Sequence, residues 1–247
     1  MTNIRSVGIV GYGSFGAFIH ELLKRFAPHV EVRVYSPGKE VNGQLFFSLE
    51  EVAKCDAVML SVPIHAFEET LVQTLPHLSP DSIIVDVATV KLHTTEILKR
   101  LAGDRKYIAT HPMFGPVSYK LRNKDIAGFR MVVTEYTVPT SLYEELKSSF
   151  KSLGFDIIEM SSDKHDKHVA ETLFLTHFIG QVVSHAKFDR TEIDTVSFGC
   201  LMDAVETVKD DTELFRDVYR FNPHCREVLN RFQSGEHEAR RILEETS

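Results

Sequence analysis

The stretch Val7-Gly8-Ile9-Val10-Gly11-Tyr12-Gly13-Ser14-Phe15-Gly16 joins a short apolar run to a glycine-rich turn. Residues 14–26, which overlap its end, place apolar side chains at helical spacing along one stripe. A strand, a G-x-G-x-x-G turn and an amphipathic helix, in this order, are typical of a dinucleotide-binding unit. The glycines permit a tight turn and let backbone N–H groups approach a pyrophosphate. The residues that we expect at the dinucleotide are Gly11, Gly13, Ser14, Phe15 and Gly16.

Strand and helix patterns alternate through the first two thirds of the chain. Strands are predicted at residues 7–10, 30–35, 57–62, 82–87, 106–109, 129–134 and 155–160. Helices are predicted at residues 14–26, 66–75, 94–101 and 139–153. Strands that alternate with helices form a parallel sheet covered on both faces. We therefore expect an α/β fold with a Rossmann-type, doubly wound and mostly parallel sheet.

The pattern changes near residue 162, after which strand signals almost disappear. Helices are predicted at residues 163–187, 195–208, 212–221 and 224–245. We expect Asp163 to cap the first of these helices, with Asp166 reaching back to it. The sequence thus predicts a dinucleotide-binding domain over residues 1–161 and a smaller, all-helical substrate and dimerisation domain over residues 162–247. So short a helical domain has a thin core of its own, which favours a homodimer.

Charge and composition exclude several classes of protein. The 247 residues hold 28 Lys and Arg against 35 Asp and Glu, a net charge of −7, which argues against a general nucleic-acid binder. No apolar run approaches the roughly 20 residues that span a bilayer, and the N-terminus lacks the apolar core of a secretory signal. The three cysteines are scattered, which suggests neither a disulfide framework nor a zinc site. We expect a cytoplasmic protein, or one of an organelle stroma if a transit peptide has been removed.

The end of the second predicted strand bears on the choice of dinucleotide. NAD-binding units carry an acidic residue there for the ribose 2′-hydroxyl, whereas this chain has Ser36. A small hydroxyl leaves room for a 2′-phosphate and Lys39 can pair with its charge, so NADP is favoured over NAD. Lys39 equally fits a solvated loop lysine, and Glu40 would oppose a phosphate if the loop turned differently. We expect Ser61 and Val62, at the end of the third strand, to line the cofactor site.

Two other strand ends carry groups that suit catalysis. Ligands of open α/β sheets bind beyond the carboxyl ends of the strands, where we expect His111, held in an extended conformation by Pro112. A histidine so placed can accept the proton of an alcohol that is being oxidised. Thr89 and Lys91 are expected over the same crevice, and Gly115 at the substrate. The alternatives are a loop histidine that caps a strand and a threonine that caps the following helix.

The long predicted helix carries four histidines, of which His165, His168 and His177 need an interpretation. His177 lies on a mostly apolar stripe of the helical wheel with Asp166, Ala170, Leu173 and Gly180. Spacing alone allows both a buried core histidine and a site residue. His165 and His168 lie one turn apart, but no third ligand has motif spacing, so no metal site is expected.

Several sequence blocks together resemble the prephenate/arogenate dehydrogenase family, most closely its short, plant-like arogenate dehydrogenases. They are G-Y-G-S-F-G at residues 11–16, D-V-A-T-V-K at 86–91, T-H-P-M-F-G-P at 110–116 and E-M-S-S-D-K-H-D-K-H-V-A-E-T-L-F-L-T-H-F-I-G at 159–180. The resemblance implies a cyclohexadienyl substrate that loses a hydride and CO₂ and becomes aromatic. It also implies that His111 accepts the hydroxyl proton, that Thr89 holds the same hydroxyl, and that His177 lines the substrate pocket.

Some positions depart from the bacterial members that this family contains. Phe174 stands where many of them have a histidine, and Asp203 where they have an arginine that holds a substrate carboxylate. The candidates for that carboxylate are Lys91, Arg130, Arg216 and Arg220. Arogenate differs from prephenate in having an ammonium group, which an acidic side chain would bind. Asp210 and Asp211 lie where plant-like members carry an aspartate, so we expect Asp211 to favour arogenate, with capping of a helix at Thr212 as the alternative.

Two other functions fit parts of the pattern. A β-hydroxyacid dehydrogenase or an imine reductase has a similar two-domain architecture, but the former enzymes use a lysine inside the long helix. Here lysines lie only near its ends, and His177 lies in its interior. A non-catalytic sensor would bind NADP without turnover, yet it has no need of a proton acceptor such as His111.

Overall fold

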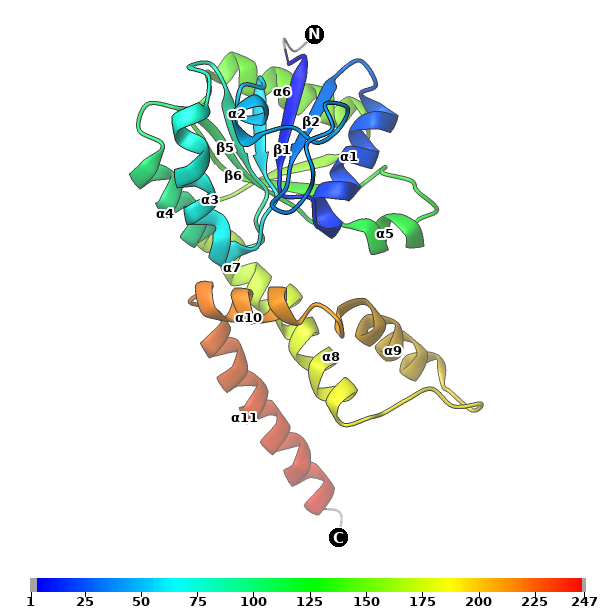
Figure 1. The fold of residues 1–247 in the computed structure, drawn as a ribbon. Helices are drawn as coiled ribbons and strands as arrows, with labels where there is room; N and C mark the ends of the chain where they lie inside the picture. Colours follow the sequence, from blue (N-terminus) through cyan, green and yellow to red (C-terminus); the bar gives the residue numbers. More distant parts are fainter. Residues whose placement is uncertain (1–3, 246–247) are drawn as a thin grey trace. The chain divides into compact units, whose positions relative to one another are not determined.

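The computed structural model describes residues 4–245. The chain divides into two compact units, of which the first ends at His165 and the second begins at Asp166 (Figure 1).

Within residues 4–165, seven strands form one sheet in the order β2-β1-β3-β4-β5-β6-β7. The strands are β1 (Ser6–Val10), β2 (Glu31–Tyr35), β3 (Ala57–Leu60), β4 (Ile83–Asp86), β5 (Lys106–Pro112), β6 (Arg130–Tyr136) and β7 (Asp156–Glu159). Neighbouring strands pair in parallel except β5 and β6, which are antiparallel. The predicted doubly wound, mostly parallel sheet of an α/β fold is confirmed.

Helices of the first unit lie on both faces of this sheet (Figure 1). They are α1 (Ser14–Phe26), α2 (Leu49–Ala53), α3 (Phe67–Thr74), α4 (Lys91–Leu101), α5 (Pro116–Leu121) and α6 (Thr140–Ser152). Successive residues of β3 face opposite ways: Val58 and Leu60 pack in one apolar cluster with α2, α3 and α4, whereas Ala57 packs in another with α1 and α5. Burial on both faces explains why the strands are nearly continuous apolar runs.

Strand β5 continues past its predicted end at Ala109, as far as Pro112. The parallel pairing with β4 stops at Ala109, but the antiparallel β6 supplies partners beyond it, after a register shift between Ala109 and Thr110. His111 therefore pairs with Val132 inside the strand. His111 lies at the carboxyl end of β5, as expected, but inside the strand rather than after it, because the sequence did not reveal this shifted pairing.

The second unit is helical. It contains the second half of α7 (Ser162–Val169), a π-turn at Ala170–Phe174, α8 (Leu175–His185), α9 (Val196–Val208), α10 (Thr212–Phe221) and α11 (Cys225–Glu244). The helix predicted at residues 163–187 exists, but its cap is Ser161 rather than Asp163, since the Ser161 hydroxyl accepts the Lys164 N–H at 3.3 Å. Within residues 4–245, no helix combines the length and the hydropathy needed to cross a membrane.

The π-turn changes which side chains are buried. A π-turn holds one residue more than an α-helical turn, so Phe174 takes the buried place predicted for Leu173. Its ring is 1% exposed and stacks on Phe215 and Tyr219 of α10, with centroids 5.6 and 5.8 Å away. His177 stays on the buried side of the helix.

Candidate active site

The turn between β1 and α1 is closely packed on one side. Gly11 has a φ of +100°, and its N–H donates to the Tyr35 carbonyl at 2.8 Å. A Cβ on Gly11 would lie 2.1 Å from the Ser61 carbonyl oxygen, and one on Gly16 would lie 2.2 Å from the Gly11 carbonyl oxygen. Only glycine fits at these two positions. A Cβ on Gly13, in contrast, would meet nothing within 4 Å.

The N-terminus of α1 suits an anionic group. Gly13 is its N-cap, no side chain caps the helix, and its first turn holds no acidic residue. Ser14 is exposed and Phe15 is half-buried in this turn. The first N–H groups of a helix attract phosphate when no side chain caps them. The turn and the open space at Gly13 therefore fit the pyrophosphate of a dinucleotide.

The ends of β2 and β3 border the same turn. Ser61 and Val62 follow β3, and a Cβ on Gly11 would lie 2.9 Å from Val62 Cγ1. Ser36 follows β2, and its carbonyl accepts the N–H of Lys39 at 3.1 Å in a turn that leaves Lys39 exposed. These strand ends meet where the strand order reverses, which is the usual place of a ligand in open α/β sheets.

A pair of buried histidines lies at the end of β5. Nδ1 of His111 is 2.9 Å from Nε2 of His165 in α7, and the two side chains are 5% and 2% exposed. Burial holds the pKa of His111 well below 6.5, and His165 and Lys91 lower it further. His111 is thus neutral at neutral pH, the state in which an imidazole can accept a proton.

Lys91 is buried beneath the end of the sheet. Its ammonium donates to Asp86 Oδ2 at 2.6 Å and to the Thr110 carbonyl at 2.7 Å, and the side chain has no exposed surface. The hydroxyl of Thr94 also donates to Asp86, at 2.6 Å. The expectation that Lys91 reaches over the crevice to a substrate is corrected, because α4 begins at Lys91 and turns its side chain inward. The network instead ties β4 to the residue before His111.

Thr89 and Gly115 flank this network along the chain. Thr89 is half-buried between β4 and α4. It does not cap α4, since Val90 is the N-cap and no side chain caps that helix. Gly115 is the N-cap of α5, and a Cβ there would meet nothing within 4 Å. Gly115 thus leaves room beside the start of α5.

In the second unit, His177 carries an unsatisfied polar atom. Among the buried side-chain nitrogen and oxygen atoms of residues 4–245, its Nδ1 is the one that lacks a hydrogen-bond partner. Burial lowers the pKa of His177, and the Asp211 carboxylate opposes that effect. Asp211 is the N-cap residue of α10 but makes no capping hydrogen bond with its side chain. A buried polar atom without a partner beside an acidic group indicates a place for a polar ligand.

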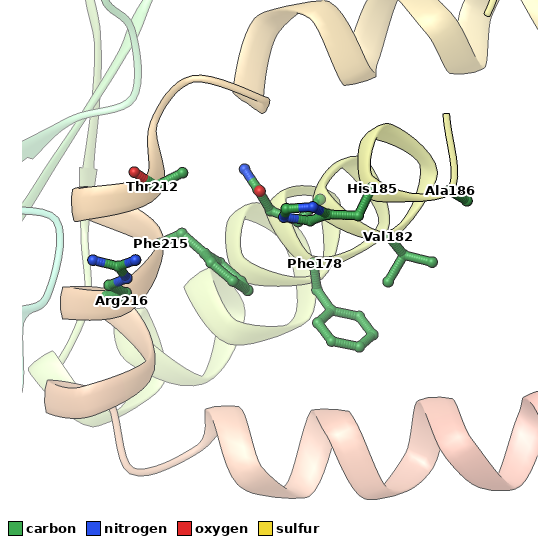
Figure 2. A pocket seen from close by; sticks show the side chains of 8 residues that line it. Phe178, Val182, His185, Ala186, Thr212, Phe215 and Arg216 are labelled. Carbon is green, nitrogen blue, oxygen red and sulfur yellow. The ribbon is translucent and has the colours of Figure 1, made fainter. Parts of the chain in front are cut away.

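An open hollow of about 610 Å³ lies beside α8 and α10. Figure 2 shows Phe178, Val182 and His185 on α8 and Thr212, Phe215 and Arg216 on α10 around it. It is lined by Phe178, Gln181, Val182, His185, Ala186, Thr212, Phe215 and Arg216. Arg216 is the cationic residue of this lining, and it was a sequence candidate for the substrate carboxylate.

The other candidates for the substrate carboxylate occupy different surroundings. Arg130 is exposed at the start of β6. The guanidinium of Arg220 lies 5.0 Å from the centroid of the Phe221 ring. Neither residue belongs to the lining of the hollow.

The described residues contain no group of three or more His, Cys, Asp or Glu that could hold a metal ion. His165 bonds to His111, while His168, one turn later, is exposed.

Comparison with known proteins gives related matches. The model for the nucleotide-binding domain of prephenate dehydrogenase matches residues 39–125. Arogenate dehydrogenase 1 of Arabidopsis thaliana is 31% identical over 241 residues, which cover 91% of this chain. The chain belongs to the prephenate/arogenate dehydrogenase family. The predicted resemblance to plant-like members of the prephenate/arogenate dehydrogenases is confirmed.

Two further matches agree with membership of the prephenate/arogenate dehydrogenase family. Arogenate dehydrogenase 2 of the same plant is 27% identical over 240 residues, 91% of this chain. The chain spans 37% and 66% of the lengths of the two plant proteins. Prephenate dehydrogenase from A. aeolicus, solved with hydroxyphenyl propionate and NAD⁺, has the same fold, with a TM-score of 0.76 and 21% identity over 98% of this chain and 91% of that one.

The two departures from bacterial members of the prephenate/arogenate dehydrogenase family have structural roles here. Phe174 packs against α10, as described above. Asp203 is held by the guanidinium of Arg190 at 2.5 Å, and Arg190 also pairs with Glu206 at 3.0 Å. A carboxylate at position 203 would repel a substrate carboxylate, so it does not replace the bacterial arginine.

The sequence did not indicate the contact of His165 with His111. His165 was weighed with His168 as half of a metal site, because the two are one turn apart. Its partner His111 lies 54 positions earlier in the chain. Two histidines in two separate family blocks were the available signal, but only the fold brings them together.

Proposed function

We propose that the chain catalyses the oxidative decarboxylation of arogenate, or of prephenate, with NADP as the hydride acceptor, a step of tyrosine biosynthesis. The observation that carries this proposal is a buried, neutral His111 on the same edge of the sheet as the glycine turn. This edge holds the carboxyl ends of β1, β3, β4 and β5, where open α/β sheets bind cofactor and substrate.

The proposed chemistry needs one proton acceptor and a well-aligned substrate. When bound, NADP supplies the nicotinamide ring that takes the hydride. Nε2 of His111 accepts the hydroxyl proton, and the ring carboxylate leaves as CO₂. Its bonding electron pair completes the aromatic ring as a phenolate, which takes the proton back from His111. Thr89 hydrogen-bonds the same hydroxyl and orients it, and the substrate passes close to Gly115. Because aromatisation drives the reaction, alignment and proton removal are the main demands on the protein.

The preference for NADP is argued from Ser36 and Lys39, since a carboxylate at position 36 would repel a 2′-phosphate. We expect Ser36→Asp to lower kcat/KM with NADP at least about tenfold and to raise it with NAD. Ser36→Ala is the matched control, because it removes the hydroxyl without adding a charge. An unchanged ratio between the two cofactors in Ser36→Asp would reject this assignment.

The side chain of the substrate is assigned to residues of the second unit. We propose that His177 contacts the substrate and that Asp211 binds the ammonium of arogenate. The partnerless Nδ1 of His177 and the electrostatic effect of Asp211 on it support this assignment. Asp211→Asn should shift the ratio of arogenate to prephenate turnover toward prephenate, and an unchanged ratio would remove Asp211 from the site.

We further propose that the protein is a homodimer in which second units meet. Large apolar side chains are exposed in that unit, for example Phe188, Ile193 and Val196. A cytoplasmic or stromal location stays a prediction.

The deciding test is the absorbance of reduced nicotinamide in four mixtures, arogenate or prephenate with NADP or NAD. We expect turnover with arogenate and NADP, and a loss of about 100-fold or more in His111→Asn. Turnover with prephenate but not with arogenate would support the proposed oxidative decarboxylation and reject the binding of an ammonium group by Asp211. If NADP binds but none of the four mixtures shows turnover, the result would favour another oxidoreductase or a sensor.

A further inference from the structure

We propose that His165 is a positioning residue for the reaction: its Nε2 accepts a hydrogen bond from Nδ1–H of His111 and so keeps Nε2 of His111 free to take the substrate proton. This inference rests on the proposed role of His111 as the proton acceptor. It assigns a task to a second histidine that has no contact with the substrate in the proposed mechanism.

The contact between the two imidazole rings limits which ring nitrogens can carry hydrogens. Nδ1 of His111 and Nε2 of His165 face each other at 2.9 Å, so a neutral pair carries one hydrogen between these two atoms. If His165 supplied that hydrogen, His111 would carry its own on Nε2 and could not act as a base. Proton acceptance therefore requires His111 to donate and His165 to accept.

The surroundings fix both rings in place. The ring planes are 77° apart with centroids 5.0 Å from each other. On one side, Lys91 holds the carbonyl of the residue before His111. On the other, the hydroxyls of Thr95 and Ser162 lie 3.3 Å apart and connect α4 to the start of α7, one turn before His165. The same helix, α4, thus anchors both members of the pair.

The partner of His111 is an imidazole rather than a carboxylate. Many catalytic histidines are oriented by a carboxylate, which also stabilises the imidazolium. The neighbours that act electrostatically on His111 are His165 and Lys91. With an imidazole as acceptor, His111 is oriented yet stays neutral before the reaction. After Nε2 has taken the substrate proton, the pair carries one positive charge, and the Nδ1 hydrogen remains shared with His165 Nε2.

The tautomer can be observed without any turnover. In the full-length protein labelled with ¹⁵N-histidine, we expect His111 to show a protonated Nδ1 and an unprotonated Nε2 at neutral pH. In His165→Phe, which keeps a ring but removes the acceptor, His111 should change to a mixture of tautomers. Protonation on Nε2 in the wild type, or an unchanged tautomer in His165→Phe, would overturn the proposal.

Kinetics provide a second test that separates positioning from folding. We expect His165→Phe to lower kcat about 10- to 100-fold with an unchanged KM for NADP, as loss of a partner that orients a functional histidine does. His165→Gln offers a carbonyl oxygen in place of Nε2 and should restore most of the loss. His168→Phe, on the exposed side of the same helix, is the matched control and should behave as the wild type.

The outcomes distinguish this inference from the proposed function. A His165→Phe variant with wild-type kcat and a wild-type melting temperature would disprove the positioning role. If the wild type oxidises neither arogenate nor prephenate, the proposed function fails, and the ¹⁵N spectra still decide whether His165 accepts from His111.

Discussion

At the scale of single residues, burial of His111 makes the stability of the protein depend on pH. Its pKa is well below 6.5 in the folded chain, whereas 6.5 is its ordinary value in an unfolded one. Below pH 6.5 the unfolded state therefore binds a proton that the folded state does not. The free energy of unfolding must fall with the pH there, by up to about 1.4 kcal/mol per pH unit.

We expect His111→Asn to lose less stability than the wild type between pH 7.5 and about pH 5.5. Urea unfolding at both pH values measures the difference. His20 and His177 also have lowered pKa values and are unchanged in the variant, so they cancel in the comparison. Equal pH slopes in the two proteins would show that His111 is not buried in its neutral form.

The buried ion pair of Lys91 and Asp86 sets a second expectation. Lys91→Met keeps the length of the side chain but leaves the Asp86 carboxylate buried beside the Thr94 hydroxyl without its cation. Removing one member of a buried ion pair costs about 3–5 kcal/mol, which urea unfolding measures. The double variant Lys91→Met/Asp86→Asn should recover part of the loss. A cost below about 1 kcal/mol in the single variant would contradict the burial of this pair.

Local sequence predicts a residue's place only when its neighbours in the chain determine that place. Gly11 and Gly16 were predictable because the tight turn gives Gly11 a positive φ and brings the Gly11 carbonyl against Gly16. The contacts of Lys91 with Thr110 and of His165 with His111 were not, since both of those partners belong to β5. A lysine at the end of a strand has the same local pattern whether it meets a substrate or a buried aspartate.

At the scale of elements, the contact of α8 with α9 depends on one glycine. A Cβ on Gly180 would lie 2.3 Å from Cγ2 of the buried Val208. Alanine would favour the helix by about 1 kcal/mol, but the overpacking costs about 1–3 kcal/mol. We therefore expect Gly180→Ala to be destabilised in thermal unfolding.

A double-mutant cycle identifies the cause of this destabilisation. In Gly180→Ala/Val208→Ala the clash is absent, so the cost should be less than the sum of the two single costs. Additive costs would show that the two helices do not meet at these residues.

The elements themselves were largely predictable, because most strands are short, nearly continuous apolar runs and most helices have an apolar period of 3.6. The helices at residues 14–26 and 212–221 have the bounds that the pattern predicts. The extension of β5 and the π-turn were not foreseen. The first depends on pairing with β6, and the second adds a residue to a helix without changing its amphipathic character.

At the scale of the whole molecule, the exposed apolar side chains of the second unit bear on assembly. Ile193 is 83% exposed and Val196 is 87% exposed, which is unfavourable for a lone chain in water. We expect sedimentation equilibrium to give twice the 28.1 kDa mass of one chain.

Charged residues in that region should weaken the dimer. Ile193→Glu/Val196→Glu should shift the equilibrium toward monomer. Val72→Glu, at a 50% exposed valine of the first unit, is the control and should not. A wild-type protein that sediments as a monomer would disprove the proposed homodimer.

The π-turn at Ala170–Phe174 also marks where this helix can change length. Removing one residue inside the turn leaves a regular α-helix in which the buried sides of the two halves stay aligned. Removing one elsewhere between residues 162 and 185 rotates one half against the other by about 100°. Aligned sequences of relatives should therefore concentrate their single-residue gaps at this turn, as the trace of an ancestral insertion that selection could tolerate.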